Sequence, residues 1–306
     1  MPLEKTVSVI IPTHNRHSML KEAVESAIKQ TDIQVEIIII DDNSQDDTAE
    51  IQKEFPKVIY HRNATNLGPG ENRRIGFNMS HGEFVVFMDD DDYYTDFSFY
   101  KKAIEQMDAH PNLAAVCANA YVYHVKDKTR EKHPLNYSEL VGGTDFLDNL
   151  SFKYRKPYST FTTVFRKSSL LKAEFPTMKM MNDFPIYLRA MTVGDIYALT
   201  DFIGDYSVHG GNISNSVSCD FIIKNLAEKE HVLKTVYKKL KDPKKWWYWH
   251  YKMTYVYFYS TCPSSTEDRR LLRWGFNHIN NSFILFLWLT YRLLRSFIAE
   301  PIRKGK

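Results

Sequence analysis

The chain contains little cysteine: Cys117, Cys219 and Cys262 are the only three among 306 residues, and no two of them form a CxxC pair. Thiols this sparse and this widely spaced predict neither a disulfide framework nor a structural zinc site. Disulfides belong to oxidising compartments, so this composition favours a reducing one, and we expect the protein in the cytoplasm.

The chain also lacks a strong excess of charge of either sign. Forty basic and 37 acidic residues leave a net charge of only +3. Proteins that grip nucleic acid over a broad surface carry a marked positive excess. We therefore expect no nucleic-acid partner, and basic character is concentrated only locally.

Long hydrophobic runs are missing as well. No apolar leader is expected, because Glu4 and Lys5 lead directly into a strand pattern. The longest apolar run, residues 283–289, is followed by Arg292 and Arg295. A spanning helix needs about 18 to 20 predominantly apolar residues. This run is too short to cross a membrane.

Two interpretations of the tail stay open. A helix over about residues 279–298, ending in the basic residues Arg303, Lys304 and Lys306, could lie on the anionic inner face of the cell membrane. Alternatively, the helix packs on the remainder of the chain or on a second subunit, so a homo-oligomer is a further expectation.

The first 110 residues alternate strand and helix patterns. Buried-strand patterns occupy residues 7–11, 35–40, 57–61 and 83–88, and helix patterns occupy 18–29, 46–55 and 71–79. Strands separated by helix-length patterns indicate parallel βαβ units. We predict an α/β fold with a mostly parallel sheet flanked by helices.

Later patterns are more mixed. Strand candidates cover residues 113–125 and 158–165, a short helix covers 183–191, and the polar stretch 126–137 suggests a loop. A lysine-rich helix follows at 220–240, and the remainder is aromatic and basic. We expect a catalytic domain over residues 1–218, divided near 110 into a donor and an acceptor half, and a helical C-terminal region over 219–306.

Acidic side chains follow two of the predicted strands. Asp41 and Asp42 come after residues 35–40, and the run 89–92 is four consecutive aspartates. Open α/β sheets bind ligands beyond the carboxyl ends of their strands. Clustered carboxylates repel one another unless a cation lies among them, and oxygen ligands suit Mg²⁺ or Mn²⁺. The alternatives are a solvated acidic loop at 89–92 and a helix cap at Asp41 or Asp42.

Four motifs in order resemble the donor half of family 2 glycosyltransferases of bacterial type, which have the GT-A fold, a Rossmann-like sheet. They are residues 7–16, 38–44, 66–68 and 89–92. The resemblance implies a nucleotide-sugar donor, by family habit a uridine diphosphate (UDP) sugar, with Mn²⁺ or Mg²⁺. It also implies transfer to a glycan, polymer or lipid-linked acceptor, as in the synthesis of cell-surface polysaccharides.

The resemblance assigns roles residue by residue. Asp89 and Asp91 match the two acids of the family's DxD motif, and Asp91 is expected to bind the metal directly. The base of the nucleotide would be contacted by Asp42 or by Asp41. An arginine near the diphosphate corresponds to Arg73, although Arg74 departs from the family pattern. The full set expected around the nucleotide sugar is Pro12, Thr13, Arg16, Asp41, Asp42, Asn66, Arg73, Asp89 and Asp90.

Two further residues resemble elements of the family's acceptor half. Asp183, in a sequence that opens a predicted helix, would be the general base that deprotonates the acceptor hydroxyl; the alternative is a helix cap. His209, in the His-Gly loop 208–214, would bind the metal or the diphosphate, or else be structural.

With one candidate base and no second carboxylate assigned as a nucleophile, we expect direct displacement with inversion at the anomeric carbon. A metal-dependent sugar nucleotidyltransferase and a catalytically inactive sugar-binding scaffold remain alternatives. The GxxxxGK[ST] motif is missing, which argues against a P-loop enzyme.

Overall fold

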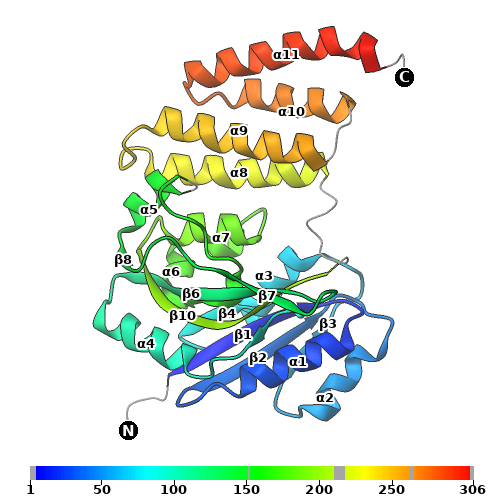
Figure 1. The fold of residues 1–306 in the computed structure, drawn as a ribbon, viewed down its shortest axis with the longest axis vertical. Coiled ribbons are helices and arrows are strands. Elements are labelled where there is room, and N and C mark those ends of the chain that lie inside the picture. Colours follow the sequence, from blue (N-terminus) through cyan, green and yellow to red (C-terminus); the bar gives the residue numbers. More distant parts are fainter. Residues whose placement is uncertain (1–4, 151, 210–217, 262–264, 304–306) are drawn as a thin grey trace. The chain divides into compact units, whose positions relative to one another are not determined.

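The computed structural model describes residues 5–150, 152–209, 218–261 and 265–303. The chain forms two compact units, Met1–Gly210 and Gly211–Lys306. Figure 1 shows strands and helices alternating in the first unit and helices in the second.

The described part of the first unit contains one sheet in the order β3-β2-β1-β4-β9-β6-β10-β5, with β7 pairing with β6 and β8 with β10. Its strands are β1 (Thr6–Thr13), β2 (Gln34–Asp41), β3 (Ile59–Arg62), β4 (Phe84–Phe87), β5 (Tyr93–Tyr94), β6 (Leu113–His124), β7 (Thr129–His133), β8 (Glu139–Val141), β9 (Thr163–Arg166) and β10 (Asp195–Val208). Strands β3, β2, β1 and β4 are mutually parallel, and β6 and β10 share their direction, whereas β9 and β5 oppose it. The predicted α/β fold with a mostly parallel sheet is confirmed.

Short helices connect these strands. They are α1 (His17–Ile28), α2 (Ile51–Glu54), α3 (Pro69–Met79), α4 (Phe99–Ala109), α5 (Gly143–Asn149), α6 (Lys167–Lys172) and α7 (Asp183–Ala190). A 3-10 turn, η1 (Asp47–Glu50), precedes α2, and the Asp46 side chain accepts a hydrogen bond from the Thr48 amide at its start. The predicted helix entry at Asp46 is thus confirmed.

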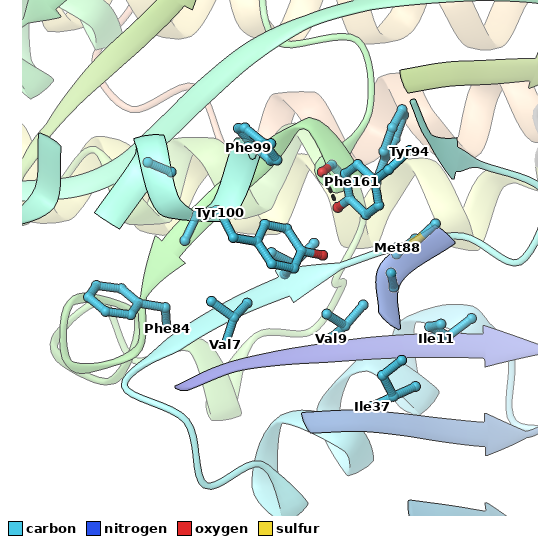
Figure 2. Packing of buried hydrophobic residues seen from close by; sticks show 14 of the residues in the cluster. Val7, Val9, Ile11, Ile37, Phe84, Met88, Tyr94, Phe99, Tyr100 and Phe161 are labelled. Atoms are coloured by element: carbon cyan, nitrogen blue, oxygen red, sulfur yellow. Dashed lines mark hydrogen bonds between the residues drawn. The ribbon is translucent and has the colours of Figure 1, made fainter. Parts of the chain in front are cut away.

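The core of this unit follows from the alternation of side chains along the strands. In β1, Val7, Val9 and Ile11 are fully buried and belong to a cluster with apolar residues of α1 and α4; Figure 2 shows them along one face of the strand. Ile10 points to the other face, where a Cβ atom on Gly76 of α3 would lie 2.3 Å from its Cγ2. Glycine lets α3 approach the sheet closely.

Two sequence expectations about strands are wrong. The first strand does not end at residue 11 before Pro12, as its apolar pattern predicts, because β1 runs to Thr13 and Pro12 pairs with Ile40 of β2. The stretch 126–137 is not only a loop, since β7 forms there antiparallel to β6. All five residues of β7 are exposed, so no apolar alternation marks this strand, and the pairing with β6 stabilises it.

The second unit contains α8 (Cys219–Val236), α9 (Pro243–Thr261), α10 (Ser265–Asn277) and α11 (Phe283–Arg303), which confirms the predicted helical region. Part of the aromatic run of α9 forms its core. Trp247 is fully buried and donates its indole N–H to the His278 carbonyl at 2.7 Å, and the Tyr251 hydroxyl donates to the Leu271 carbonyl at 2.7 Å. None of the described helices combines the length and the hydrophobicity that crossing a bilayer requires.

Candidate functional site

The carboxyl ends of β1, β2 and β4 meet at one edge of the sheet. Thr13 is the last residue of β1 and pairs with Asp41, the last residue of β2. The Thr13 hydroxyl donates a hydrogen bond of 2.7 Å to Oδ2 of Asp90, which follows β4. Acidic side chains from two different strands therefore lie beside the same strand end, as the strand order requires.

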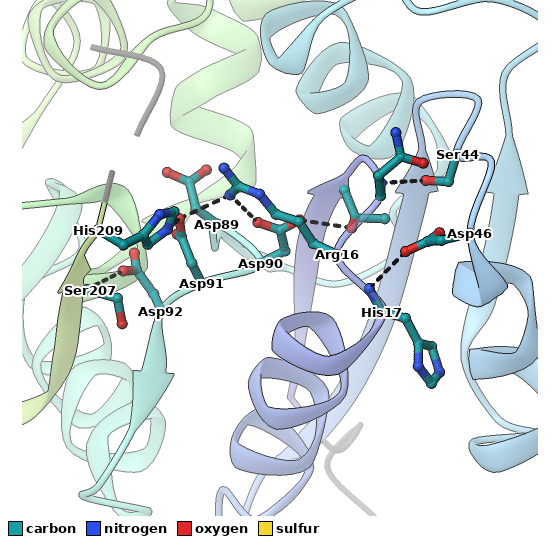
Figure 3. Close-up of polar contacts among 12 residues, drawn as sticks. Arg16, His17, Ser44, Asp46, Asp89, Asp90, Asp91, Asp92, Ser207 and His209 are labelled. Atoms are coloured by element: carbon teal, nitrogen blue, oxygen red, sulfur yellow. Dashed lines mark hydrogen bonds and ion pairs between the residues drawn. The ribbon is translucent and has the colours of Figure 1, made fainter. Parts of the chain in front are cut away.

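Arg16 joins two of the four consecutive aspartates. Its Nη1 lies 2.9 Å from Asp90 Oδ1 and 3.0 Å from Asp91 Oδ2 (Figure 3). Asp90 is buried, and burial raises the pKa of its carboxyl to about 6 although the charge of Arg16 acts in the opposite direction. The solvated-loop interpretation of the acidic run is wrong, because these carboxylates have fixed partners within the fold.

Asp91 also faces a histidine from another strand. Nε2 of His209, which follows β10, lies 2.8 Å from Asp91 Oδ2. Residues 210–214 of the predicted His-Gly loop lie outside the described residues. The contact brings together two residues that the sequence assigned to the metal, although they are 118 positions apart.

Asp92 was not assigned a role from the sequence, but it is the most enclosed acid of the run. It accepts hydrogen bonds from the Ser159 hydroxyl at 3.1 Å and the Ser207 amide at 3.3 Å. Burial, reinforced by the charges of Asp89 and Asp91, holds its pKa well above the usual range of a carboxyl. Its position in the acidic run was the signal that pointed to it.

The structure settles which of the two arginines faces the acids. Arg73 is buried, and its Nη2 lies 2.5 Å from Asp89 Oδ1. Arg74 instead donates to the backbone carbonyls of Pro176 and Met178 at 2.8 and 2.6 Å. Arg73 therefore belongs to the acid cluster, and Arg74 anchors a neighbouring segment.

Asp41 and Asp42 are both buried and hold loops in place. Asp41 accepts hydrogen bonds from the Ser44 amide at 2.8 Å and from the Tyr60 hydroxyl. Asp42 accepts from the amides of Leu67 and Gly68 at 2.7 and 2.8 Å. Neither carboxylate is the cap of the following helix, since Asp46 has that position.

Asp42 thereby fixes the loop that carries Asn66. Asn66 is exposed next to these two amides, and Gly68 has a φ of +84°, a conformation that favours glycine. Pro12 is buried in β1. Pro12, Thr13 and Asp42 therefore lie at the same sheet edge, beside the acid cluster.

Asp183 is the first residue of α7, and Asn182 precedes it at the N-cap position. Its Oδ2 lies 3.3 Å from Nζ of Lys156, and 27% of its side chain is exposed. The Arg73 guanidinium also donates to the carbonyl of Met181, two residues before Asp183, at 3.0 Å. Asp183 thus lies close to the acid cluster. Sequence reasoning missed Lys156, because no motif marks it.

Two side chains of the site are of types that can bind a divalent cation. Asp91 Oδ2 and His209 Nε2 lie 2.8 Å apart and contact each other directly. Carboxylate and imidazole donors suit Mn²⁺. Within the described residues, no three acidic, thiol or imidazole groups converge on one point.

Comparisons with known proteins place this geometry in a family. The family model described as glycosyl transferase family 2 matches residues 8–185, which include the sheet edge, the acid cluster and Asp183. A structure of residues 1–349 of S. aureus TarS in complex with UDP-GlcNAc covers 99% of this chain and 92% of its own, with a TM-score of 0.73 and 18% identity. That similarity confirms the GT-A fold of the chain.

Curated relatives are similar over shorter stretches. A Campylobacter jejuni GalNAc(5)-diNAcBac-PP-undecaprenol beta-1,3-glucosyltransferase is 42% identical over 91 residues, covering 28% of this chain and 29% of the relative. A Bacillus spizizenii poly(ribitol-phosphate) beta-glucosyltransferase is 32% identical over 94 residues, covering 28% of this chain and 15% of the relative. The chain thus spans less than a third of each. An uncharacterized glycosyltransferase of Haemophilus influenzae is 24% identical over 248 residues, covering 78% of this chain and 93% of the relative. Because the family model matches more than half of its length, the chain belongs to glycosyl transferase family 2.

Proposed function

We propose that the protein is a metal-dependent, inverting glycosyltransferase that moves a sugar from a UDP-sugar to a hydroxyl group of a glycan, polymer or lipid-linked acceptor. The observation that carries the proposal is the meeting of Asp90, Asp91 and Arg16 with the end of β1 at one sheet edge. This edge lies within the region that matches the family. TarS, whose fold is similar, was crystallised in complex with UDP-GlcNAc.

The donor side of the site suits a nucleoside diphosphate. Asp91 and His209, with Asp89 nearby, would hold Mn²⁺ or Mg²⁺, which would neutralise charge on the departing diphosphate. Arg73 and Arg16 supply guanidinium groups that match phosphate oxygens in geometry. Asp42 keeps the loop 66–68 beside the position expected for the base.

On the acceptor side, Asp183 is the proposed general base. Its carboxylate accepts the proton of the acceptor hydroxyl while that oxygen forms a bond to the anomeric carbon of the sugar. The bond between that carbon and the diphosphate oxygen breaks at the same time, and its electron pair leaves with UDP. Attack from the face opposite the leaving group inverts the anomeric configuration.

The acceptor is proposed from the relatives. The names of the two glucosyltransferases describe a diphosphate-linked undecaprenol and a poly(ribitol-phosphate). Both of the molecules named carry phosphate groups. We therefore expect an acceptor from the assembly of cell-surface polymers.

A membrane contact would suit such an acceptor. Large apolar side chains of α11 are exposed and recur every three or four positions, at Phe283, Leu287, Tyr291 and Leu294. A helical stripe of this kind can lie in the interface of an anionic membrane. We propose this location, on the cytoplasmic side, over a contact with a second copy of the chain.

The experiment that tests the activity is incubation of the protein with UDP-sugars, Mn²⁺ and candidate acceptors, followed by measurement of the released products. Sugar transfer releases UDP from the UDP-sugar, whereas a sugar nucleotidyltransferase leaves the UDP-sugar intact unless pyrophosphate is added, and then converts both to UTP and a sugar 1-phosphate. The anomeric configuration of the product then tests inversion. A protein that binds no nucleoside diphosphate in the presence of Mn²⁺ would instead be a scaffold.

A further inference from the structure

The first unit contains a pocket that the donor site does not use. It has a volume of about 320 Å³ and is lined by β6 and β7 residues, including Asn119 and His133, and by the segment 155–158. This volume lies within the range of small-molecule sites. None of the strand-end acids lines it, so it is distinct from the proposed position of the nucleotide.

The segment 155–158 connects this pocket to the proposed base and to the acid cluster. Lys156 lines the pocket, and its Nζ lies 3.3 Å from Asp183 Oδ2. Ser159, the next residue after the segment, donates to Asp92 at 3.1 Å. Lys156 is thus shared between the pocket and the carboxylate that is proposed to deprotonate the acceptor.

The pocket also has a cation that the fold does not use. Arg155 is exposed and lines the pocket. Its backbone amide donates to Asn136, but within the described residues its guanidinium has no hydrogen-bond or ion-pair partner. Lys156 differs, because its ammonium donates to the carbonyls of Pro157 and Tyr158 at 2.8 and 2.9 Å. Lys156 holds the segment in shape, and Arg155 is available for a ligand.

The same pocket is also lined by an aromatic residue. Tyr158 is 39% exposed, and its ring packs at 5.6 Å from the ring of His133 and at 4.8 Å from that of Tyr206. Apolar CH groups of a sugar or polyol pack well on such a face, because an aromatic ring offers a large rigid surface. The forked guanidinium of Arg155, in the same lining, matches the oxygens of a phosphate group in two hydrogen bonds.

We propose that this pocket binds the acceptor through a phosphate group that the acceptor carries, with Arg155 as the phosphate contact and Tyr158 as the surface for its sugar or polyol. The inference rests on the proposed function, because it concerns the acceptor of that reaction, and Lys156 of the pocket contacts the proposed base Asp183. The phosphate belongs either to a polyol-phosphate polymer or to a lipid diphosphate.

Binding measurements separate this proposal from activity. We would titrate the wild-type protein with ribitol 5-phosphate, with ribitol, and with a polyprenyl-diphosphate-linked N-acetylhexosamine in detergent micelles, using calorimetry. The variant Arg155→Met removes the guanidinium at an exposed position. Lys153→Met is the matched control, since Lys153 is an exposed cation two positions before Arg155 that does not line the pocket.

We expect Arg155→Met to lower the affinity for a phosphate-bearing probe by roughly 10-fold to 100-fold, the effect of losing a charge-assisted contact. Lys153→Met should leave that affinity unchanged. A loss confined to ribitol 5-phosphate identifies a polyol-phosphate acceptor, and one confined to the lipid probe identifies a lipid diphosphate. The proposal is overturned if neither phosphate probe binds the wild type, if ribitol binds as well as its phosphate, or if Arg155→Met binds both probes as the wild type does.

A second measurement distinguishes failure of this inference from failure of the proposed function. Thermal unfolding of the same preparations with UDP and Mn²⁺ reports on the donor site alone. If UDP stabilises the wild type and Arg155→Met equally, and the substitution does not change the affinity for the acceptor probes, only the pocket assignment fails. If UDP stabilises neither, the proposed glycosyltransferase function fails.

Discussion

Nη2 of Arg73 lies 2.5 Å from Oδ1 of Asp89, and the same guanidinium donates to the Met181 carbonyl at 3.0 Å. One buried side chain thus connects the first acid after β4 with the segment that leads into α7 and Asp183. A planar fork can bind both partners simultaneously, which a lysine ammonium on a flexible stem cannot reproduce. Arg73 is therefore positioned to couple the donor and acceptor sides of the site.

The first prediction concerns Arg73→Lys. We expect UDP to bind at least about 10-fold more weakly in the presence of Mn²⁺, because one charge-assisted contact is lost, and kcat/KM to fall by a similar factor. The matched control is Arg74→Lys, whose guanidinium contacts backbone carbonyls at 2.8 and 2.6 Å. Equal losses of UDP affinity in the two variants would show that Arg73 has only a structural role.

The second prediction concerns the proposed base. Asp183→Asn keeps the shape of the side chain but removes the proton acceptor, so turnover should fall by about 100-fold to 10,000-fold. Affinity for UDP with Mn²⁺, measured by calorimetry, should remain that of the wild type. Asp201→Asn, which alters an ion pair with Lys102 at 2.7 Å on β10, should keep full turnover. An Asp183→Asn variant with wild-type turnover would exclude Asp183 as the base.

The third prediction concerns the metal. Treatment with a chelator should abolish transfer, and added Mn²⁺ should restore it. His209→Gln, which replaces the imidazole 2.8 Å from Asp91, should require a higher Mn²⁺ concentration for half-maximal activity, whereas Asp91→Asn should not be rescued. The control is His81→Gln, because that exposed histidine pairs with Glu36 outside the site. Full activity of the chelated protein would contradict metal dependence.

The fourth prediction concerns Asp42, whose carboxylate accepts from the Leu67 and Gly68 amides and from the Asn63 side chain at 3.0 Å. Asp42→Asn replaces one accepting oxygen with an NH₂ donor that faces other donors. A buried group left unsatisfied costs about 1–3 kcal/mol, so the free energy of unfolding should fall by that amount. Denaturant unfolding measures it, with the exposed Asp47→Asn as control. A loss of UDP affinity without a loss of stability would show instead that Asp42 acts only by contacting the uracil base of UDP.

The sheet and the strand-end acids could be predicted because local signals are strong there. Residues 37–40 and 84–88 are apolar and end directly in aspartates, and parallel strands bring such ends together. The strand β7 could not be predicted, because its five residues are all exposed and only pairing with β6 stabilises them.

Other parts of the site depend on contacts that no local pattern encodes. The choice between Arg73 and Arg74 depends on the rotation of α3 relative to the sheet, and adjacent helical residues point in different directions. The contact of Lys156 with Asp183 joins segments 27 positions apart, and the loop that contains Lys156 carries no motif. The pocket at Arg155 could not be predicted from the sequence for the same reason, because it forms only where β6, β7 and the later segment 155–158 come together.

The last prediction tests the exposed stripe of α11. Leu287 is 52% exposed within this stripe, and Leu140 of β8, in the other unit, is 51% exposed, so Leu287→Glu and Leu140→Glu form a matched pair. A glutamate placed in the lipid interface opposes binding through desolvation and through repulsion by anionic headgroups. We expect the wild type and Leu140→Glu to sediment with vesicles of phosphatidylglycerol and phosphatidylethanolamine, and Leu287→Glu to remain in the supernatant. Light scattering on the same samples reports the molecular mass. If Leu287→Glu changes the mass of the particle but leaves sedimentation with vesicles unchanged, the stripe is a contact between copies of the chain, and the membrane proposal is wrong.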